Sequence, residues 1–455
     1  MAASTASGTG ASTASGAAAS TASGTGASTA SGAAASTAVP AGPNLLRDRD
    51  FLLFAGGQGA SALGDALSKT ALPLLVLALT GSGLHMGLIA MLTALPMMLL
   101  GVAAGAWADR FDRRRMMLWS DVGRAVLVAA VPLAALFDLP MLPVLYAIAV
   151  PVGVLYAVFE AACLSCVPSL VGRDRLGEAN SLLSIGNALG YIAGPALAGV
   201  LVTGIGGAGT LGVDALTFAV SAVSLMLIRR PLQTAREHPP APMRRQVLEG
   251  FRFIAGHRLL RAALLYWAAI TFFTAPIIIC ATYFIREDLG WSPGVLGSII
   301  AVYAVGAIAG AVLASRIKEA SVAVMCAGTV LGSVGLLVLS VTASLPLALG
   351  VVLLAGGGES LSAILYSTLR ARLTPDELLG RVTTTAQVAA FSLKPLSVLV
   401  AGLALEATSG SLTLAVIAVS CIAISVAFGL FSRRLPTAAP ATPLLPTLTP
   451  QEVVR

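Results

Sequence analysis

The chain has 455 residues, of which 57% are apolar and only 11% are charged. About a quarter of the residues of a soluble protein are charged, so this composition excludes an ordinary soluble protein and predicts an integral membrane protein. The net charge of +7 would suggest a nucleic-acid partner in a soluble chain. Here the basic residues fall in alternate connections between apolar segments, as membrane topology requires, and we expect no nucleic-acid partner.

The two ends of the chain differ in composition from the rest. Residues 3–18 repeat without change as residues 19–34, and this tract has neither charge nor large apolar side chains. Nothing in it offsets the entropy lost on ordering, so we expect residues 1–44 to be a disordered tail. The Pro- and Thr-rich residues 435–455 predict a second disordered tail. A signal peptide is not indicated, because a basic segment followed by an apolar one is missing.

Continuous apolar segments of about 20 residues, the length that spans a bilayer, recur between residues 51 and 431. Strands of an outer-membrane barrel would alternate apolar and polar residues, so a barrel is excluded. The segments predict an all-α integral membrane protein with twelve transmembrane helices. We place them at residues 51–80, 84–108, 115–137, 143–168, 179–203, 207–228, 261–285, 293–315, 321–342, 345–368, 382–405 and 411–431.

The longest polar insert lies in the middle of the chain and predicts two halves. We expect a six-helix bundle over residues 45–228, a central loop over residues 229–260 and a second six-helix bundle over residues 261–434. The halves echo each other, because Asp174-Arg175-Leu176 resembles Asp376-Glu377-Leu378 at an offset of about 200 residues. Two six-helix pseudo-repeats are typical of transporters that rock around a site at the membrane midplane.

Basic residues set the expected orientation. Arginine and lysine occur before the first helix, in the even-numbered connections and after the last helix, whereas the opposite connections hold only Arg286. This bias predicts a multi-pass protein of the bacterial cytoplasmic membrane with both termini and the central loop in the cytoplasm. The three histidines lie in loops or at helix ends with no metal-ligand spacing, and we find no nucleotide-binding loop, so we expect no metal and no cofactor.

One motif lies in the connection between the second and third helices. It comprises Gly105, Asp109, Arg110 and a basic cluster that starts at Arg113. This segment resembles the loop signature of the major facilitator superfamily, although Asp112 stands where the family usually has glycine. The resemblance implies the major facilitator fold, with Asp109 and Arg113 stabilising the outward-facing state through contacts with the eleventh helix and the basic cluster. The alternative is that the arginines serve only as topology signals.

A second motif lies in the fifth helix, where Gly190, Gly194, Pro195 and Gly199 resemble the antiporter motif of exporters in this superfamily. Glycines at these spacings allow a neighbouring helix to approach closely, and the proline permits a bend. A plain packing groove would need the same residues. Residues 58–65, 176–181 and 375–382 further resemble the enterobactin-exporter and macrolide-efflux branch, which favours export.

Charged residues inside the expected helices are costly and are usually paired or face a cavity. Asp65 and Lys69 are one turn apart in the first helix, an order that favours an ion pair. They either line the transport cavity or form a neutral pair that fixes helix packing. Arg124 in the third helix and Glu160 in the fourth lie at the same expected depth and could pair.

The second half carries two further charges inside expected helices. Glu359 follows three glycines in the tenth helix and has no basic residue within a turn, while Lys394 precedes Pro395 at the middle of the eleventh. In this superfamily the first, fourth, seventh and tenth helices line the central cavity. A carboxyl on the first, fourth and tenth helices would suit a carrier of protons, because burial favours the neutral form of a carboxyl.

These patterns favour a secondary transporter, and not an enzyme. We expect a proton-coupled exporter, that is an antiporter, of a small hydrophobic or amphipathic compound such as a drug, siderophore or secondary metabolite, which works in the lipid bilayer as a monomer. An importer or a lipid flippase on the same scaffold is the nearest alternative. An integral membrane enzyme acting on lipids is more distant, because it would show clustered His, Asp or Ser at a membrane edge.

Overall fold

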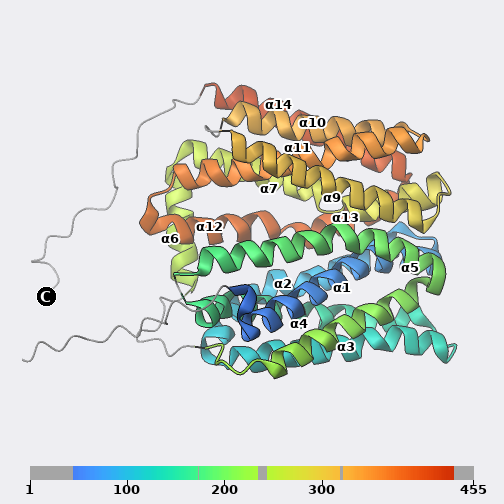
Figure 1. Ribbon diagram of the computed structural model, residues 1–455. Coiled ribbons are helices and arrows are strands. Elements are labelled where there is room, and N and C mark those ends of the chain that lie inside the picture. Colours follow the sequence, from blue (N-terminus) through green and yellow to red (C-terminus); the bar gives the residue numbers. More distant parts are fainter. Residues whose placement is uncertain (1–44, 173, 234–242, 318–320, 435–455) are drawn as a thin grey trace, which may run out of the picture. The chain divides into compact units, whose positions relative to one another are not determined.

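The computed structural model describes residues 45–172, 174–233, 243–317 and 321–434, without the side chains of Val102, Asp109 and residues 243–247. Both expected tails lie outside these residues. Every regular element within the described ranges is helical (Figure 1).

The first half contains a short 3-10 turn, η1 (Leu45–Arg47), and five long helices. These are α1 (Arg49–Thr80), α2 (Gly83–Arg110), α3 (Arg113–Leu136), α4 (Met141–Val171) and α5 (Leu176–Leu227).

The second half contains shorter segments. These are α6 (Met243–Gly256), α7 (Arg258–Thr274), α8 (Ile277–Tyr283), the π-helical turn η2 (Phe284–Asp288), α9 (Pro293–Arg316), α10 (Val322–Val341), α11 (Leu345–Arg372), α12 (Asp376–Phe391), α13 (Lys394–Ala407) and α14 (Gly410–Ser432).

Eleven helical segments of the described chain are long and apolar enough to cross a membrane. One of them, α5, has 52 residues and is two helices merged across a kink at Gly206, where φ is 75° and ψ is 170°. A single helix of that length would be about 78 Å long, more than twice the ~30 Å hydrocarbon core. Figure 1 shows α5 turning back at this point. The fold is therefore all-α with twelve membrane-spanning helices, as the apolar segments predicted.

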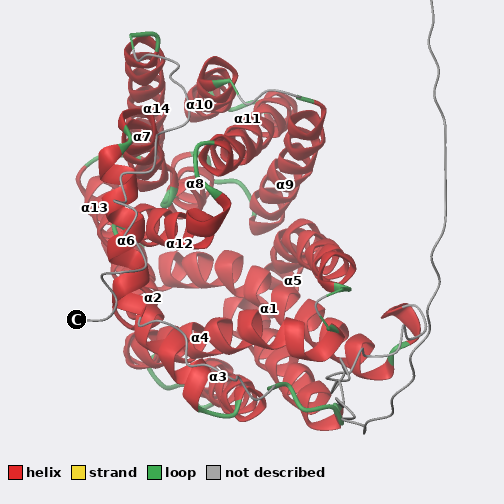
Figure 2. Cartoon of the chain, turned by 90° about the vertical axis from the view of Figure 1, so that its left-hand side faces the viewer, coloured by secondary structure: helices red, strands yellow, loops and turns green. Residues whose placement is uncertain are grey.

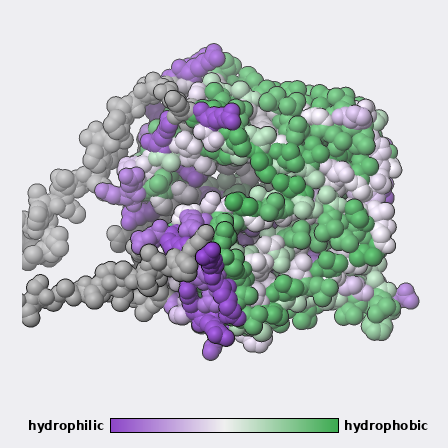
Figure 3. Space-filling model, in the orientation of Figure 1, coloured by the Kyte–Doolittle hydropathy of each residue, from purple (hydrophilic) through white to green (hydrophobic). Residues whose placement is uncertain are grey.

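Helix α6 lies within the segment that the sequence predicted to be a loop. Ile254 of α6 is buried in a small apolar cluster with Leu260 and Val382, and Glu249 Oε2 forms an ion pair with Arg381 Nη1 at 2.6 Å. These contacts attach α6 to α7 and α12. Figure 3 shows hydrophilic residues gathered at the end of the bundle that contains α6, and a broad hydrophobic surface over the rest. We call this end the α6 end and the opposite one the far end.

The two halves meet closely at two places. Figure 2 shows α2 beside α13 and α5 beside α9, and Figure 1 shows that the start of α2 and the start of α9 lie at the far end. At the first, the start of α2 packs on the end of α13, where a methyl group added to Gly87 would lie 2.7 Å from Val398 O and 2.8 Å from Gly402 Cα. At the second, α5 packs on the start of α9, where a methyl group on Gly297 would lie 2.4 Å from Pro195 O. Only glycine permits such approaches of two backbones. We call these contacts the α2–α13 closure and the α5–α9 closure.

Two membrane spans of the second half are broken at prolines. Pro276 lies between α7 and α8, and Pro395 is the second residue of α13, which follows α12 after a two-residue break. Because Pro276 has no N–H, it cannot bond to the carbonyl of Phe272 one turn earlier. The Ser397 hydroxyl donates a hydrogen bond to that carbonyl instead. This hydrogen bond connects the broken span of α7 and α8 with the broken span of α12 and α13.

Candidate functional site

The interior of the first half contains a network of charges centred on Arg124 of α3. Its side chain is 1% exposed, and its Nη2 lies 2.5 Å from Asp121 Oδ1. Its Nη1 lies 3.7 Å from Asp65 Oδ1 of α1. Glu160, which the sequence analysis offered as a partner of Arg124, is not bonded to it in the described structure, and Asp121 takes that place.

Two aromatic rings enclose the same guanidinium. The Arg124 Cζ atom lies 4.5 Å from the ring centroid of Phe159 on α4 and 4.2 Å from that of Phe218 on α5. A guanidinium attracts the faces of aromatic rings, and more strongly when water is excluded. Arg124, on α3, therefore contacts side chains of α1, α4 and α5. Protonation of one of its carboxyl partners would alter the packing of all four helices.

A further carboxyl, Asp214 of α5, was not singled out from the sequence. It is 1% exposed and accepts hydrogen bonds from Ser68 of α1 and from Thr217. A single aspartate inside the apolar stretch after Gly206 was the available signal, because ionisable residues at membrane depth are rare and usually functional.

Lys69 does not pair with Asp65, the partner that their spacing suggested. Its Nζ lies 3.5 Å from the hydroxyl of Tyr191 on α5 and 5.2 Å from the centroid of that ring. Both Lys69 and Tyr191 are exposed, although each lies between 11 and 15 residues from the far end of its helix. They therefore face open space at mid-membrane depth.

Glu359 of α11 accepts a hydrogen bond from the Tyr303 hydroxyl of α9. Within the described residues no basic side chain forms an ion pair with it. Lys394, the remaining charge of the second half, is exposed at the first residue of α13. It does not reach Glu359 as an ion pair but experiences the charge of Lys69 from the first half.

The motif between α2 and α3 is described except for the side chain of Asp109, which lies outside the described part. Arg113 is 4% exposed and donates hydrogen bonds from Nε to Ala108 O at 3.1 Å and from Nη1 to Ser165 O at 2.6 Å. Arg110 is exposed, and Gly105 is partly buried. Asp112, which departs from the family pattern, caps α3 by accepting a bond from Arg115 N at 2.8 Å. Arg113 thus ties the loop to α4.

The Gly-Pro motif of α5 serves two neighbours. A methyl group on Gly194 would lie 2.4 Å from Ala66 Cβ of α1, and one on Gly190 would lie 3.2 Å from Leu63 N. Gly199 faces the other half instead, where a methyl group would lie 2.7 Å from Pro293 O. The motif therefore packs α5 against α1 within its half and forms one of the two closures.

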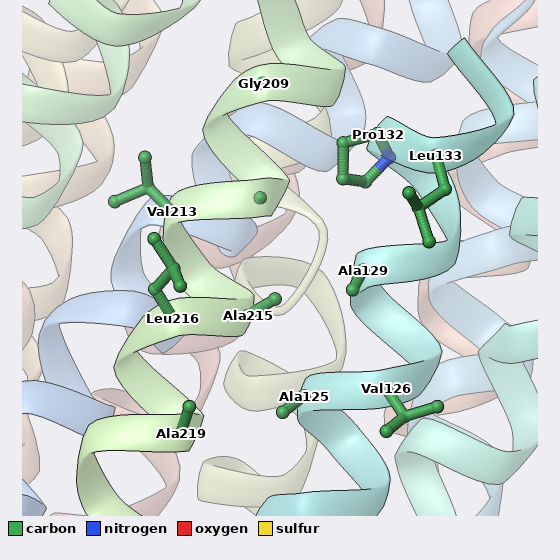
Figure 4. A pocket seen from close by; sticks show the side chains of 11 residues that line it. Ala125, Val126, Ala129, Pro132, Leu133, Gly209, Val213, Ala215, Leu216 and Ala219 are labelled. Carbon is green, nitrogen blue, oxygen red and sulfur yellow. The ribbon is translucent and has the colours of Figure 1, made fainter. Parts of the chain in front are cut away.

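A groove of about 590 Å³ lies between α3 and the second part of α5 (Figure 4). Its lining is almost wholly apolar and includes Ala129, Pro132 and Ala219, with Val126 and Leu216 each 66% exposed at its edge. No charged residue lines it. The groove therefore faces the lipid and is separate from the charged interior.

The interior thus offers four carboxyls, on α1, α3, α4 and α5, in the first half and one on α11 in the second. Such groups can take up and release protons, and the exposed lysines can bind an anion. Within the described residues no cluster of His, Cys, Asp and Glu could hold a metal ion.

Comparison with known proteins assigns this arrangement to a family. The model of the Major Facilitator Superfamily matches residues 54–393 and 269–449. The multidrug efflux pump Tap of Mycolicibacterium fortuitum is 29% identical over 355 residues, which cover 74% of this chain and 85% of the relative. The enterobactin exporter EntS of Shigella boydii is 26% identical over 331 residues, which cover 71% of this chain and 77% of the relative.

Solved structures agree on the fold. A bacterial homologue of the human lysosomal transporter Spinster superposes with a TM-score of 0.70 at 15% identity and covers 88% of this chain and all of its own. A bacterial homologue of the iron transporter ferroportin superposes with a TM-score of 0.66 at 18% identity, over 86% of this chain and all of its own.

Proposed function

Since the chain belongs to the Major Facilitator Superfamily, we propose that it is a proton-coupled exporter of a small hydrophobic or amphipathic compound such as a drug, siderophore or secondary metabolite. It is a multi-pass membrane transporter with small-molecule substrates, like its relatives, and not an enzyme. The export direction is supported by the names of Tap and EntS.

The observation that carries the coupling proposal is the setting of Glu359. This carboxyl lies within a membrane span, is bonded to a neutral tyrosine hydroxyl and, among the described residues, has no ion-pair partner. An ionised carboxyl without a counter-charge is costly in the membrane, so the neutral, protonated form crosses between states at lower cost. Asp65, in contrast, lies beside Arg124, which favours its ionised form.

The same structure supports a proposal for the domains and the topology. We propose two six-helix halves over residues 45–228 and 261–434, joined by residues 229–260, with the α6 end in the cytoplasm of a bacterium, as the basic connections favour. The closures at the far end then correspond to an inward-facing state. Figure 3 is consistent with this reading, because the surface is recessed between the two groups of helices toward the α6 end. The protein works as a monomer in this proposal.

The experiment starts by identifying the substrate, from a comparison of metabolites in culture supernatants with and without the gene. Proteoliposomes with this compound then compare Glu359→Gln with the wild type under an imposed proton gradient. We expect the variant to lose uphill accumulation but to keep downhill exchange. Glu287→Gln, which changes a carboxyl in η2 at the far end, is the matched control and retains both. Uphill accumulation by Glu359→Gln would assign coupling to Asp65 or Glu160 instead.

A further inference from the structure

Two lysines from opposite halves of the chain lie inside membrane spans. Lys69 of α1 and Lys394 of α13 are both exposed in the middle of membrane spans, and Lys394 lies within reach of the charge of Lys69. A lysine exposed to lipid at this depth would be very costly. Because the two lysines belong to different halves and are close enough to repel, they face the space between the halves rather than the lipid.

The closures fix where this pair lies along the membrane. Lys394 is one turn from Val398, which forms the α2–α13 closure, and Tyr191 is one turn from Pro195, which forms the α5–α9 closure. In both cases the residue is displaced from the closure toward the α6 end. Lys69 contacts Tyr191. The three side chains therefore lie where the space between the halves ends, just beneath the two closures.

Carboxyls lie in the neighbourhood of Lys69, but among the described residues none is within ion-pair distance of either lysine. Neither lysine forms an ion pair there, whereas the nearby guanidinium of Arg124 has two carboxyl partners. Asp65 and Glu160 attract Lys69 through space but do not bond to it. In addition, α13 begins at Lys394, and the first turn of a helix carries partial positive charge. Two like charges held together at mid-membrane depth favour the arrival of an anion.

We propose that Lys69, Lys394 and Tyr191 form a binding subsite for an acidic group of the transported compound, such as a carboxylate or a phosphate. This inference rests on the proposed function, since it assigns a chemical class to its substrate. An anionic group between the lysines replaces repulsion between the halves by attraction, and the tyrosine hydroxyl adds a hydrogen-bond donor. Binding of the acidic group then stabilises the approach of α1 and α13.

The test uses the purified full-length protein and three probes with the same ring, namely 1-naphthoate, 1-naphthamide and 1-naphthylmethylammonium. Binding is measured by isothermal titration in detergent without a proton gradient. We expect 1-naphthoate to bind at least about tenfold more tightly than the neutral amide, the gain typical of hydrogen bonds to charged groups, and the ammonium to bind most weakly. Lys69→Met and Lys394→Met should each remove this preference, whereas Lys69→Arg should retain it.

The third lysine of the chain, Lys318, supplies the matched control, because Lys318→Met removes the same charge in the connection between α9 and α10. Equal affinities for 1-naphthoate and 1-naphthamide in the wild type, including no binding of either, overturn the proposal. So does a preference that persists in the Lys69→Met, Lys394→Met double variant. The proposed function fails separately, if the wild type does not accumulate its own substrate uphill in proteoliposomes.

Discussion

Replacing Arg124 by methionine tests whether its network stabilises the first half. Methionine fills much of the same volume but leaves Asp121, which is fully buried, without its partner at 2.5 Å. Removing one member of a buried ion pair costs about 3–5 kcal/mol, and loss of the two desolvated cation–π contacts adds to this, by about 2 kcal/mol or more for each. We therefore expect Arg124→Met to lower stability by at least about 3 kcal/mol.

The measurement is the apparent Tm of the purified protein in detergent, followed by the loss of the monodisperse peak in size-exclusion chromatography. A domain of this half's size loses about 2–4 °C per kcal/mol, so we expect the Tm to fall by about 6 °C or more. The double variant Arg124→Met, Asp121→Asn removes the stranded charge and should recover part of that loss. A single variant within about 2 °C of the wild type, or a double variant no more stable than the single, would refute the reasoning.

Three further outcomes follow from other parts of the chain. Gly402→Leu places a side chain where even a methyl group would lie 2.8 Å from Gly83 O, so it should open the α2–α13 closure. A cysteine that replaces Lys394 should then be labelled more strongly by a membrane-impermeant thiol reagent added from the far side. Asp109→Asn should abolish most transport and leave substrate binding largely intact, measured as turnover in proteoliposomes against equilibrium binding; equal losses would place Asp109 in the binding site. Deleting residues 2–38, which have neither charge nor large apolar side chains, should leave insertion and transport unchanged in everted vesicles, and a large loss at equal expression would contradict this.

The membrane helices could be predicted from the sequence because each span is a continuous apolar segment of bilayer length. Helix α6 could not, since its apolar residues are interrupted by charges and its burial depends on contacts with α7 and α12. The breaks near Pro276 and Pro395 fall at prolines, but the sequence predicted unbroken helices over residues 261–285 and 382–405. The hydrogen bond from Ser397 to the carbonyl of Phe272, which connects the two breaks, could not be predicted, because these residues lie in spans far apart in the chain.

Partners of the buried charges were harder to predict than their presence. Spacing within one helix suggested that Lys69 pairs with Asp65, and equal depth suggested that Arg124 pairs with Glu160. The structure directs Lys69 to Tyr191 and Arg124 to Asp121. The rotation of each helix about its axis decides such contacts, and packing against other helices sets that rotation. Asp214 illustrates the same limit, because its bond to Ser68 depends on how α5 lies against α1.

Glycine at both closures has a consequence for the rate and reversibility of switching. Where two backbones touch without side chains between them, parting them frees few rotamers and uncovers little apolar area, so neither conformer gains a large advantage from the contact itself. A carrier whose two conformers are nearly equal in free energy can be driven either way by modest differences in ligand affinity. Moving a population from 1:99 to 99:1 takes about 5.5 kcal/mol, which ligands that bind one conformer more tightly than the other can supply. A closure lined by leucines would instead bury more apolar area. It would stabilise one conformer and slow each cycle, because the closure would have to open against that stabilisation.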